Sequence, residues 1–159
     1  MPDFDRVYMR NIKRVYRLCY AKLGHRMDAE DAAQNVFLRW LRSGKNFDGD
    51  EHEKAYFLRA AHNECVNIKL SIWRTRRVEF EDLAPELISS EDETGYAEIA
   101  ETMRRLPEKY REVLYLACCE GLKTAEIAAI LRRNESTVRT QLQKARELMR
   151  KMLIETEEM

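Results

Sequence analysis

The chain has 159 residues with 28 basic and 28 acidic side chains, so its formal net charge is zero. Charged residues make up 35% and hydrophobic residues 45%, which fits one globular domain or two small ones. No run approaches the roughly 18 apolar residues of a membrane span, and the start lacks the apolar core of a signal peptide. We therefore expect a cytoplasmic protein without membrane insertion. A neutral total, taken alone, argues against a nucleic-acid-binding protein.

The charge is distributed unevenly along the chain, and a count by segment reverses that argument. Residues 1–77 carry 16 Lys and Arg against 10 Asp and Glu, and residues 102–151 carry 12 against 6, so each segment has a net charge of +6. Residues 78–101 carry nine acidic side chains and no basic one, and residues 152–159 add −3. Two basic modules on either side of an acidic segment are compatible with nucleic-acid binding.

The acidic segment contains Pro85 and a turn-prone run at 89–95, which is typical of a linker. We therefore expect a first domain over residues 1–77, a linker over 78–95 and a second domain over 96–159. A solvated loop whose charge only aids solubility is the alternative interpretation of the acidic residues.

The residues that could carry catalysis or bind a metal form no recognisable pattern. Cys19, Cys65, Cys118 and Cys119 have no Cys-x-x-Cys spacing, and the three histidines form no ligand pattern. We expect four core or boundary thiols and no metal site. The sequence also has no paired carboxylates, nucleophile–base set or glycine-rich phosphate loop, so we expect neither an enzyme nor a cofactor.

Two helices are predicted at the start of the first domain. Apolar residues recur every three or four positions over 4–23, and Gly24 can supply the left-handed residue that ends this helix. Asp28 is expected to cap a second helix that runs to about Arg42. The apolar sides comprise Phe4, Tyr8, Ile12, Val15, Cys19 and Leu23 in the first helix, and Ala29, Ala33, Val36, Phe37 and Trp40 in the second.

A loop over 43–50 precedes a third, long helix that runs to about Arg76, with Asp50 and Glu53 as a capping box at its start. One face of this helix can fill a core, and another forms a polar stripe. The core face comprises Phe57, Ala61, Cys65 and Ile68, and the stripe comprises Arg59, Asn63, Asn67, Ser71 and Arg74.

The polar stripe has two interpretations. A solvated face is the norm for a surface helix. Alternatively, the amides contact base edges while the flanking arginines hold phosphates. Trp73 lies among Arg74, Arg76 and Arg77, an arrangement suited to stacking bases beside a backbone contact.

The second domain has the dimensions of a helix-turn-helix. A short helix over 96–106 stops at Pro107, and a core helix containing Val113, Leu114, Leu116 and Ala117 ends near Gly121. Thr124 is expected to cap a short helix over 125–131, and Asn134 a longer one that runs to about Met152. The interior of the motif comprises Ile127, Ala128, Leu131, Val138 and Leu142.

The last helix carries short polar and basic side chains that can reach base edges and phosphates from a major groove. Arg132, Arg133, Arg146, Arg150 and Lys151 add positive charge around it. An ordinary helical hairpin is the alternative, but spacing, caps and charge together favour DNA binding. The predicted DNA-contacting residues are Ser136, Thr137, Arg139, Thr140, Gln143 and Lys144.

Four segments in this order, 28–39, 106–114, 121–128 and 136–146, resemble the signatures of one family. They resemble the DAED..Q..FL, LP...REVL and helix-turn-helix motifs of bacterial sigma factors of the sigma-70 family, in the extracytoplasmic-function (ECF) group. The resemblance covers nearly the whole chain, with a variable linker between its two halves.

This resemblance implies a first domain of the sigma region 2 type, which binds the β′ clamp helices of core RNA polymerase and melts the −10 promoter element. Asn63 matches an asparagine beside the pocket for a flipped base, and the loop Phe47–Lys54 matches the loop that closes over it. The implied polymerase contacts are Asp31, Gln34, Asn35, Phe37 and Leu38. With the polar stripe and the arginines around Trp73, the predicted −10 contacts are Arg59, Asn63, Asn67, Trp73, Arg74, Arg76 and Arg77.

The second domain resembles sigma region 4, which recognises the −35 element and rests on the β flap of the polymerase. Three positions in it depart from the family pattern. Arg132 stands where a glycine is usual, so we expect a different turn or a positive φ. Arg133 replaces an apolar residue and Gln141 a basic one. In the first domain, Glu51-His52-Glu53 replace a common Ser-x-Phe.

We therefore predict an all-α, two-domain transcription initiation factor that binds core polymerase and promoter DNA, with no enzymatic site, cofactor or metal of its own. The resemblance also implies an anti-sigma protein as partner. Two alternatives stay open: a helix-turn-helix regulator whose N-terminal helices serve dimerisation, and a purely structural helical adaptor.

Overall fold

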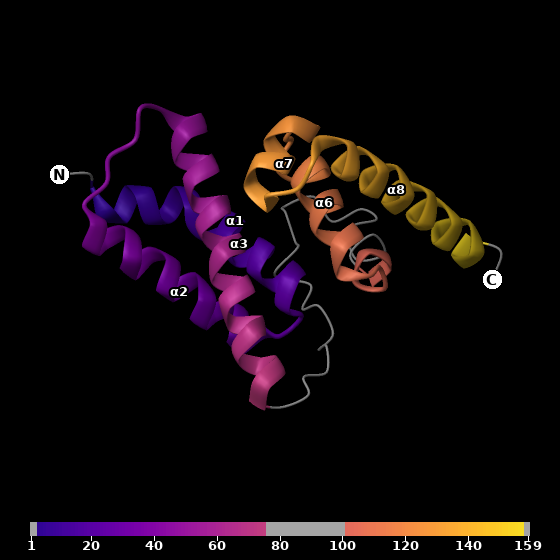
Figure 1. The fold of residues 1–159 in the computed structure, drawn as a ribbon, viewed down its shortest axis with the longest axis horizontal. Helices are drawn as coiled ribbons and strands as arrows, with labels where there is room; N and C mark the ends of the chain where they lie inside the picture. Colours follow the sequence, from indigo (N-terminus) through magenta and orange to yellow (C-terminus); the bar gives the residue numbers. More distant parts are fainter. Residues whose placement is uncertain (1–2, 76–100, 158–159) are drawn as a thin grey trace. The chain divides into compact units, whose positions relative to one another are not determined.

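A computed structural model describes residues 3–75 and 101–157 of the chain (Figure 1). Within these ranges every regular element is an α-helix. The chain divides into two compact units, unit 1 over Met1–Glu81 and unit 2 over Asp82–Met159. The predicted all-α fold with two small helical domains is thereby confirmed. The predicted linker, residues 78–95, lies outside the described residues.

Unit 1 is built from three helices that all pack against one another: α1 (Phe4–Leu23), α2 (Arg26–Ser43) and α3 (Asp50–Thr75). Gly24 ends α1 as predicted, with φ 73° and its N–H donating to the Tyr20 carbonyl at 2.8 Å. Gly44 ends α2 in the same way, with φ 66° and a 3.2 Å bond to the Trp40 carbonyl. A residue with a Cβ would be strained at either position.

An aromatic cluster fills the core of unit 1 where α2, α3 and the loop between them meet. The Phe57 ring lies 5.1 Å from the Phe37 ring, 5.7 Å from the Trp40 ring and 5.6 Å from the Phe47 ring, measured between centroids. Trp40 also donates its indole N–H to the Lys45 carbonyl at 2.9 Å. The aromatic cluster therefore ties the loop over residues 44–49 to the helices on either side of it.

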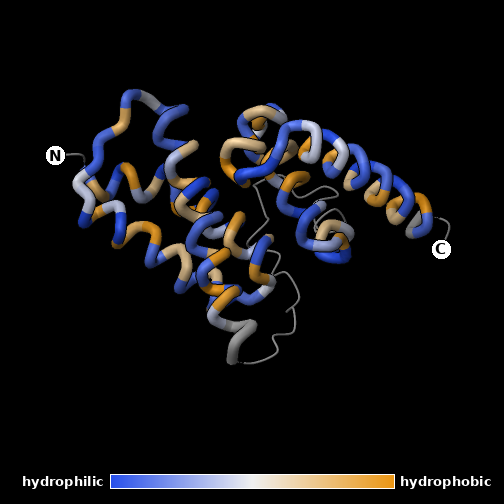
Figure 2. Tube along the Cα trace, viewed as in Figure 1, coloured by the Kyte–Doolittle hydropathy of each residue, from blue (hydrophilic) through white to orange (hydrophobic). Residues whose placement is uncertain are grey.

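The predicted core faces of α2 and α3 are confirmed, apart from a half-buried Ile68. Hydrophobic positions recur along each helix with hydrophilic ones between them (Figure 2). Phe4, predicted for the core face of α1, is instead 36% exposed and stacks at the edge of the core, 5.8 Å from the Trp40 ring. Val7 and Leu18, which lie on a neighbouring face of α1, are buried.

The predicted caps of α2 and α3 are wrong. Helix α2 begins at Arg26, so Asp28 lies inside its first turn, and His25 takes the capping position without a side-chain hydrogen bond. Helix α3 begins at Asp50 itself. The Glu53 N–H donates to the Gly49 carbonyl at 3.1 Å and makes the first backbone hydrogen bond of this helix. The Glu53 carboxylate does not complete a capping box, because it accepts from Arg10 on α1.

Unit 2 contains α6 (Glu108–Cys118), α7 (Thr124–Leu131) and α8 (Glu135–Glu157). Helices α6 and α7 both pack against α8. The structure describes residues 101–106 of the helix predicted over 96–106. Residues 101–104 are helical, and the helix ends before Leu106. The core beneath α8 comprises Leu106, Leu114, Leu142 and Ala145, with Met103, Tyr110, Ala117, Leu148, Met149 and Met152 packed against it.

Of the two helix caps predicted in unit 2, the one at Asn134 lies where expected and the one at Thr124 is wrong. Asn134 directly precedes α8 as predicted, and its carbonyl accepts from the Val138 N–H at 3.0 Å. Thr124 does not cap α7, because it is the first residue of that helix and its hydroxyl donates to Glu135 at 3.0 Å. The Glu126 carboxylate instead accepts from the Lys123 N–H at 2.9 Å. Helix α8 also continues past Met152.

The four cysteines fall into two environments. Cys19 and Cys65 are buried where α1 meets α3, and a hydrogen bond with Cys65, followed by burial, raises the pKa of the Cys19 thiol. Cys118 and Cys119 are exposed at the end of α6, so the prediction of core or boundary thiols is wrong for this pair. In the described part of the chain, no helix is long and apolar enough to span a membrane.

Candidate nucleic-acid interface

Helices α7 and α8 and the three-residue turn between them form a helix-turn-helix. Ile127 and Val138 are fully buried between the helices. The other predicted interior residues, Ala128, Leu131 and Leu142, are exposed by 8% or less. The apolar spacing therefore identified the motif correctly.

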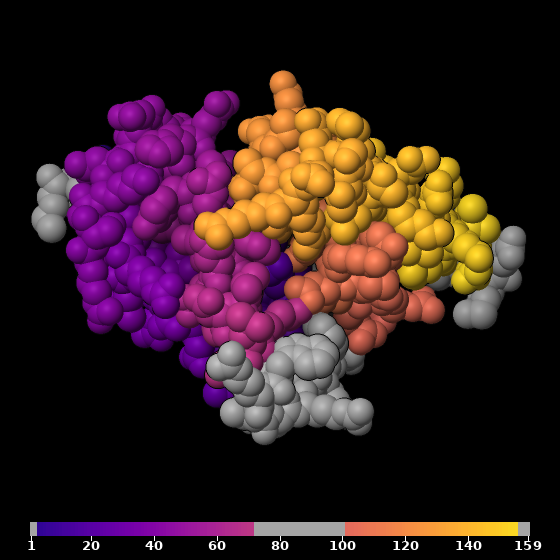
Figure 3. Space-filling model, in the orientation of Figure 1, coloured from indigo at the N-terminus to yellow at the C-terminus, as the bar shows by residue number. Residues whose placement is uncertain are grey.

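The predicted recognition residues all lie exposed on the first half of α8, and none of the six is buried: Ser136, Thr137, Arg139, Thr140, Gln143 and Lys144. A space-filling view shows the surface of unit 2, with α8 towards the yellow end of the colour bar (Figure 3). Arg139 forms an ion pair with Glu135 at 3.1 Å, and the Thr140 hydroxyl donates to the Ser136 carbonyl at 3.0 Å. Such exposed surface groups can exchange these contacts for DNA at little cost.

Of the two outcomes expected for Arg132, a different turn or a positive φ, the structure shows the positive φ. Arg132 has φ 56° and ψ 49°, in the left-handed region that usually needs glycine. The backbone N–H of Arg133, the next residue, donates to the Ala128 carbonyl at 3.0 Å. A left-handed residue with a Cβ costs about 1–2 kcal/mol, so other contacts must hold this turn.

Those contacts come from Arg133, which joins three elements of unit 2. Its guanidinium donates to the Glu112 carboxylate on α6 and, at 3.0 Å, to the Gln141 side-chain oxygen on α8. Glu112 is 1% exposed, and burial lowers the pKa of the Arg133 guanidinium. We call this set of three residues the Arg133 clamp. It fixes α8 relative to α6 and was not predicted, although Arg133 and Gln141 were the departures from the family pattern.

In unit 1 a hollow of about 210 Å³ lies between α2 and α3 and contains two of the predicted DNA-contacting residues, Arg59 and Asn63. Tyr56 and Arg39 also line it and were not predicted. The Tyr56 ring, the Arg59 guanidinium and the Asn63 amide provide a stacking surface, a phosphate donor and a base-edge partner, whereas Arg39 is paired at 2.9 Å with Glu64, which also lines the hollow. Asn67 is exposed further along α3. The side chains of Trp73 and Arg74, and the whole of Arg76 and Arg77, lie outside the described residues.

The structure corrects one of the five residues of α2 that were predicted to contact the polymerase. Asp31, Gln34 and Leu38 are exposed, with Leu38 at 39%. Asn35 is exposed too, and its amide donates to Glu64 on α3 at 3.1 Å. Phe37 is 3% exposed, 4.9 Å from the Tyr8 ring and 5.1 Å from the Phe57 ring, so it is a core residue and not a surface contact.

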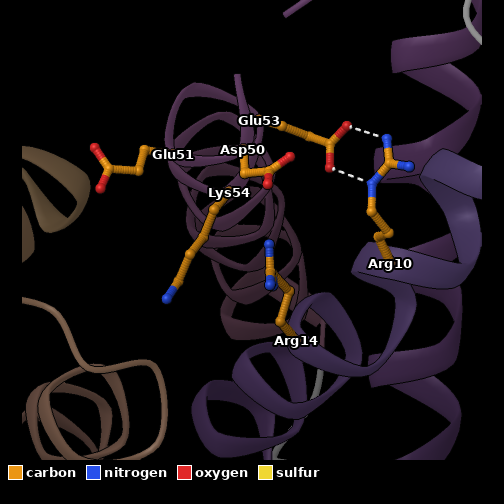
Figure 4. Close-up of a pocket in the computed structure, with 6 residues that line it drawn as sticks. All are labelled: Arg10, Arg14, Asp50, Glu51, Glu53 and Lys54. Atoms are coloured by element: carbon orange, nitrogen blue, oxygen red, sulfur yellow. Dashed lines mark hydrogen bonds and ion pairs between the residues drawn. The ribbon is translucent and has the colours of Figure 1, made fainter.

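An ion pair between the buried Glu53 and the half-exposed Arg10 anchors the end of the loop that leads into α3 (Figure 4). Arg10 on α1 donates to both oxygens of Glu53, at 2.8 and 3.0 Å, and Asn11 donates to the same carboxylate at 3.0 Å. Glu53 is 5% exposed. The hydrogen bond from Arg10 is the largest cause that lowers the pKa of Glu53; burial opposes it and the Asn11 bond adds to it.

Comparison with known proteins matches both units to one family. A family model described as "Sigma-70 region 2" matches residues 7–75, and one described as "Sigma-70, region 4" matches residues 96–149. The ECF RNA polymerase sigma factor SigE of Mycolicibacterium smegmatis is 31% identical over 96% of the chain. The chain belongs to the sigma-70 family, in its ECF group.

Other members of the family give further matches. The ECF RNA polymerase sigma factor SigW of Bacillus subtilis is 29% identical over 88% of this chain and 83% of its own length. The chain spans only 62% of the length of the SigE relative.

The fold of this sigma-70 member is also found in solved structures. The sigma factor RpoE from Bartonella quintana, in complex with the anti-sigma factor NepR, superposes with a TM-score of 0.77 over 96% of this chain and 98% of its own, at 16% identity. CnrH, in complex with the cytosolic domain of CnrY, has a TM-score of 0.63 at 23% identity, over 94% of this chain and 86% of its own. At such identities these structures support the fold alone.

The first prediction concerns the Arg133 clamp of the region 4 unit. Arg133→Ala leaves the buried Glu112 carboxylate without its cation, so we expect a loss of about 3–5 kcal/mol in the stability of unit 2. The double variant Glu112→Gln with Arg133→Met removes both charges and should recover most of that loss. Hydrogen exchange of α6 and α8 amides measures both variants. Equal protection in Arg133→Ala and the wild type would show that the clamp is not structural.

The second prediction concerns Glu53 in the region 2 unit. Its pKa is lowered in the folded state. The carboxylate therefore stabilises the fold at neutral pH, and this contribution is lost as the pH falls below the ordinary glutamate pKa towards the folded value. We expect Glu53→Gln to destabilise unit 1 by about 1.5–3 kcal/mol at neutral pH and by less in acid.

Urea unfolding followed by tryptophan fluorescence at several pH values tests this prediction, because both tryptophans, Trp40 and Trp73, belong to unit 1. Glu51→Gln is the control, because Glu51 is an exposed carboxylate two positions earlier. A Glu53→Gln effect of the same size at every pH would contradict the assigned role of the carboxylate charge.

Proposed function

We propose that this chain is an alternative sigma factor, which binds core RNA polymerase, directs it to specific promoters and supplies no catalytic chemistry of its own. The observation that carries the proposal is the presence of both sigma-70 regions in one chain, each with an open polar surface on its long helix. A regulator that uses only a helix-turn-helix needs no region 2 unit.

Unit 2 would recognise the −35 element through α8 and contact the β flap of the polymerase. The exposed Ser136, Thr137 and Lys144 support this role, because short hydroxyls and a flexible cation suit base edges and phosphates in a major groove. The Arg133 clamp supports it further, since a recognition helix must be held at a fixed angle to dock productively.

Unit 1 would open the −10 element and hold a base extruded from the duplex. The hollow lined by Tyr56, Arg59 and Asn63 supports this, because a flipped base needs a stacking partner and a polar group for its edge. The adjoining loop is tied down on both sides, by the Trp40 indole and by the Arg10–Glu53 pair. A loop anchored in this way can close over a base without a large ordering cost.

The partners of the chain would be core polymerase, promoter DNA and an anti-sigma protein. The exposed side of α2, with Gln34 and Leu38, would contact the β′ clamp helices. Two of the similar solved structures are complexes, one with the anti-sigma factor NepR and one with the cytosolic domain of CnrY. We therefore propose that an anti-sigma protein binds this chain in the cytoplasm and holds it inactive.

Run-off transcription with purified core polymerase tests the proposal. We expect the chain to direct initiation at a specific start site that core alone does not use. Gln34→Ala and Leu38→Ala should each weaken core binding about tenfold, because truncating an interface anchor costs about 1–2 kcal/mol. Met9→Ala on α1 is the control and should bind normally, because Met9 is an apolar side chain that is even more exposed than Leu38, at 71% against 39%.

Two results would overturn the proposal. If the chain neither binds core nor directs a specific start, it is not a sigma factor. If the chain binds DNA through α8 but does not bind core, and Gln34→Ala and Leu38→Ala change nothing, the chain is a helix-turn-helix regulator.

A further inference from the structure

A hollow of about 470 Å³ lies between the first turn of α6 and the first half of α8 in unit 2. It includes four of the predicted recognition residues together with two residues of α6, which occupy variable positions of the LP...REVL motif and were not predicted to contact DNA. Its walls are formed by Lys109, Tyr110, Ser136, Thr137, Thr140, Gln141 and Lys144.

The chemistry of the hollow suits an anion. Two of its lining residues carry ammonium groups, four carry hydroxyls and one carries an amide, and none carries a carboxylate. The hollow beside the Arg10–Glu53 pair in unit 1 is different, because three of its six lining residues, Asp50, Glu51 and Glu53, are acidic (Figure 4). Ammonium and hydroxyl donors without competing carboxylates are the groups that hold phosphate oxygens.

Two contacts fix the position of donor groups in the hollow. The Lys109 Nζ lies 5.0 Å from the centroid of the Tyr110 ring, and that ring packs against the core of unit 2. The ammonium group is thus held near a fixed aromatic surface. The Gln141 side-chain oxygen already accepts from Arg133, so the NH₂ of the amide is what Gln141 can offer to an anion.

We propose that this hollow binds a phosphate of the DNA backbone beside the bases that α8 contacts, and that α6 is therefore a second DNA-contacting element, through Lys109 and Tyr110. The inference rests on the proposed function and assigns a new site within it. A helix in a major groove about 12 Å wide has a phosphate strand along each side. Side chains on a neighbouring helix that share a hollow with α8 would reach that strand and not the base edges. The contact would give affinity without sequence preference.

The test compares Lys109→Gln with the wild-type chain, each assembled with core polymerase, by fluorescence anisotropy on promoter duplexes over a range of salt concentrations. One lost phosphate contact lowers the slope of log affinity against log salt by about 0.9, which is an eightfold loss at about 0.1 M salt and a fourfold loss at about 0.2 M. The same factor is expected on a promoter with a scrambled −35 element. Lys109→Arg should retain wild-type affinity.

Lys13→Gln is the matched control, because Lys13 is an exposed lysine on α1 in the other unit and its loss changes the net charge equally. It should leave the salt slope unchanged. The inference is overturned if Lys109→Gln has the slope of this control, or if its loss of affinity is confined to the intact −35 element.

Run-off transcription by the same preparations separates this inference from the proposed function. A wild-type chain that directs no initiation overturns both. A wild-type chain that initiates normally, beside a Lys109→Gln chain with an unchanged salt slope, overturns the phosphate site alone.

Discussion

Buried glutamates that are paired with arginines from other helices or turns hold this fold together. Glu53 on α3 is paired with Arg10 on α1, and Glu112 on α6 with Arg133 in the turn before α8. Glu64 on α3 is paired with Arg39 on α2 at 2.9 Å. A carboxylate in an apolar interior is costly unless a cation meets it in the right geometry. Small helical units have few features that fix the position of one helix along the next. These ion pairs fix it.

Each of these pairs lies beside a surface that we assign to nucleic acid. Glu53 secures the end of the loop that precedes α3, Glu64 lines the hollow that contains Asn63, and Glu112 acts through Arg133 on the helix that carries the recognition residues. An apolar replacement of such a pair can be as stable, so stability alone does not account for its presence. The pairs place polar side chains on long helices at defined positions, which promoter recognition requires.

The sequence was sufficient to predict helices α1, α2 and α3, the core faces of α2 and α3 apart from Ile68, and the helix-turn-helix, because these follow from the local spacing of apolar residues. It was insufficient for the pairs, since Arg10 and Glu53 lie 43 positions apart and no periodic pattern links them. For the same reason Glu53 was assigned to a cap, which is a local motif. Phe37 was assigned to a surface because the family motif contains it, although the spacing in α2 had already placed it on the core side.

The zero net charge of the chain conceals two basic segments, and it is consistent with a subunit that binds DNA weakly until it joins the polymerase. In the proposed function, region 2 opens the promoter through the hollow around Asn63 while region 4 holds the −35 element independently. Permanganate reactivity of thymines in the −10 region, measured with core polymerase and a supercoiled promoter, tests this most directly. Reactive thymines should appear with the wild-type chain and be strongly reduced with Asn63→Ala, while protection of the −35 element from nuclease stays the same. Unreduced reactivity in Asn63→Ala, or no opening with the wild-type chain, would contradict it.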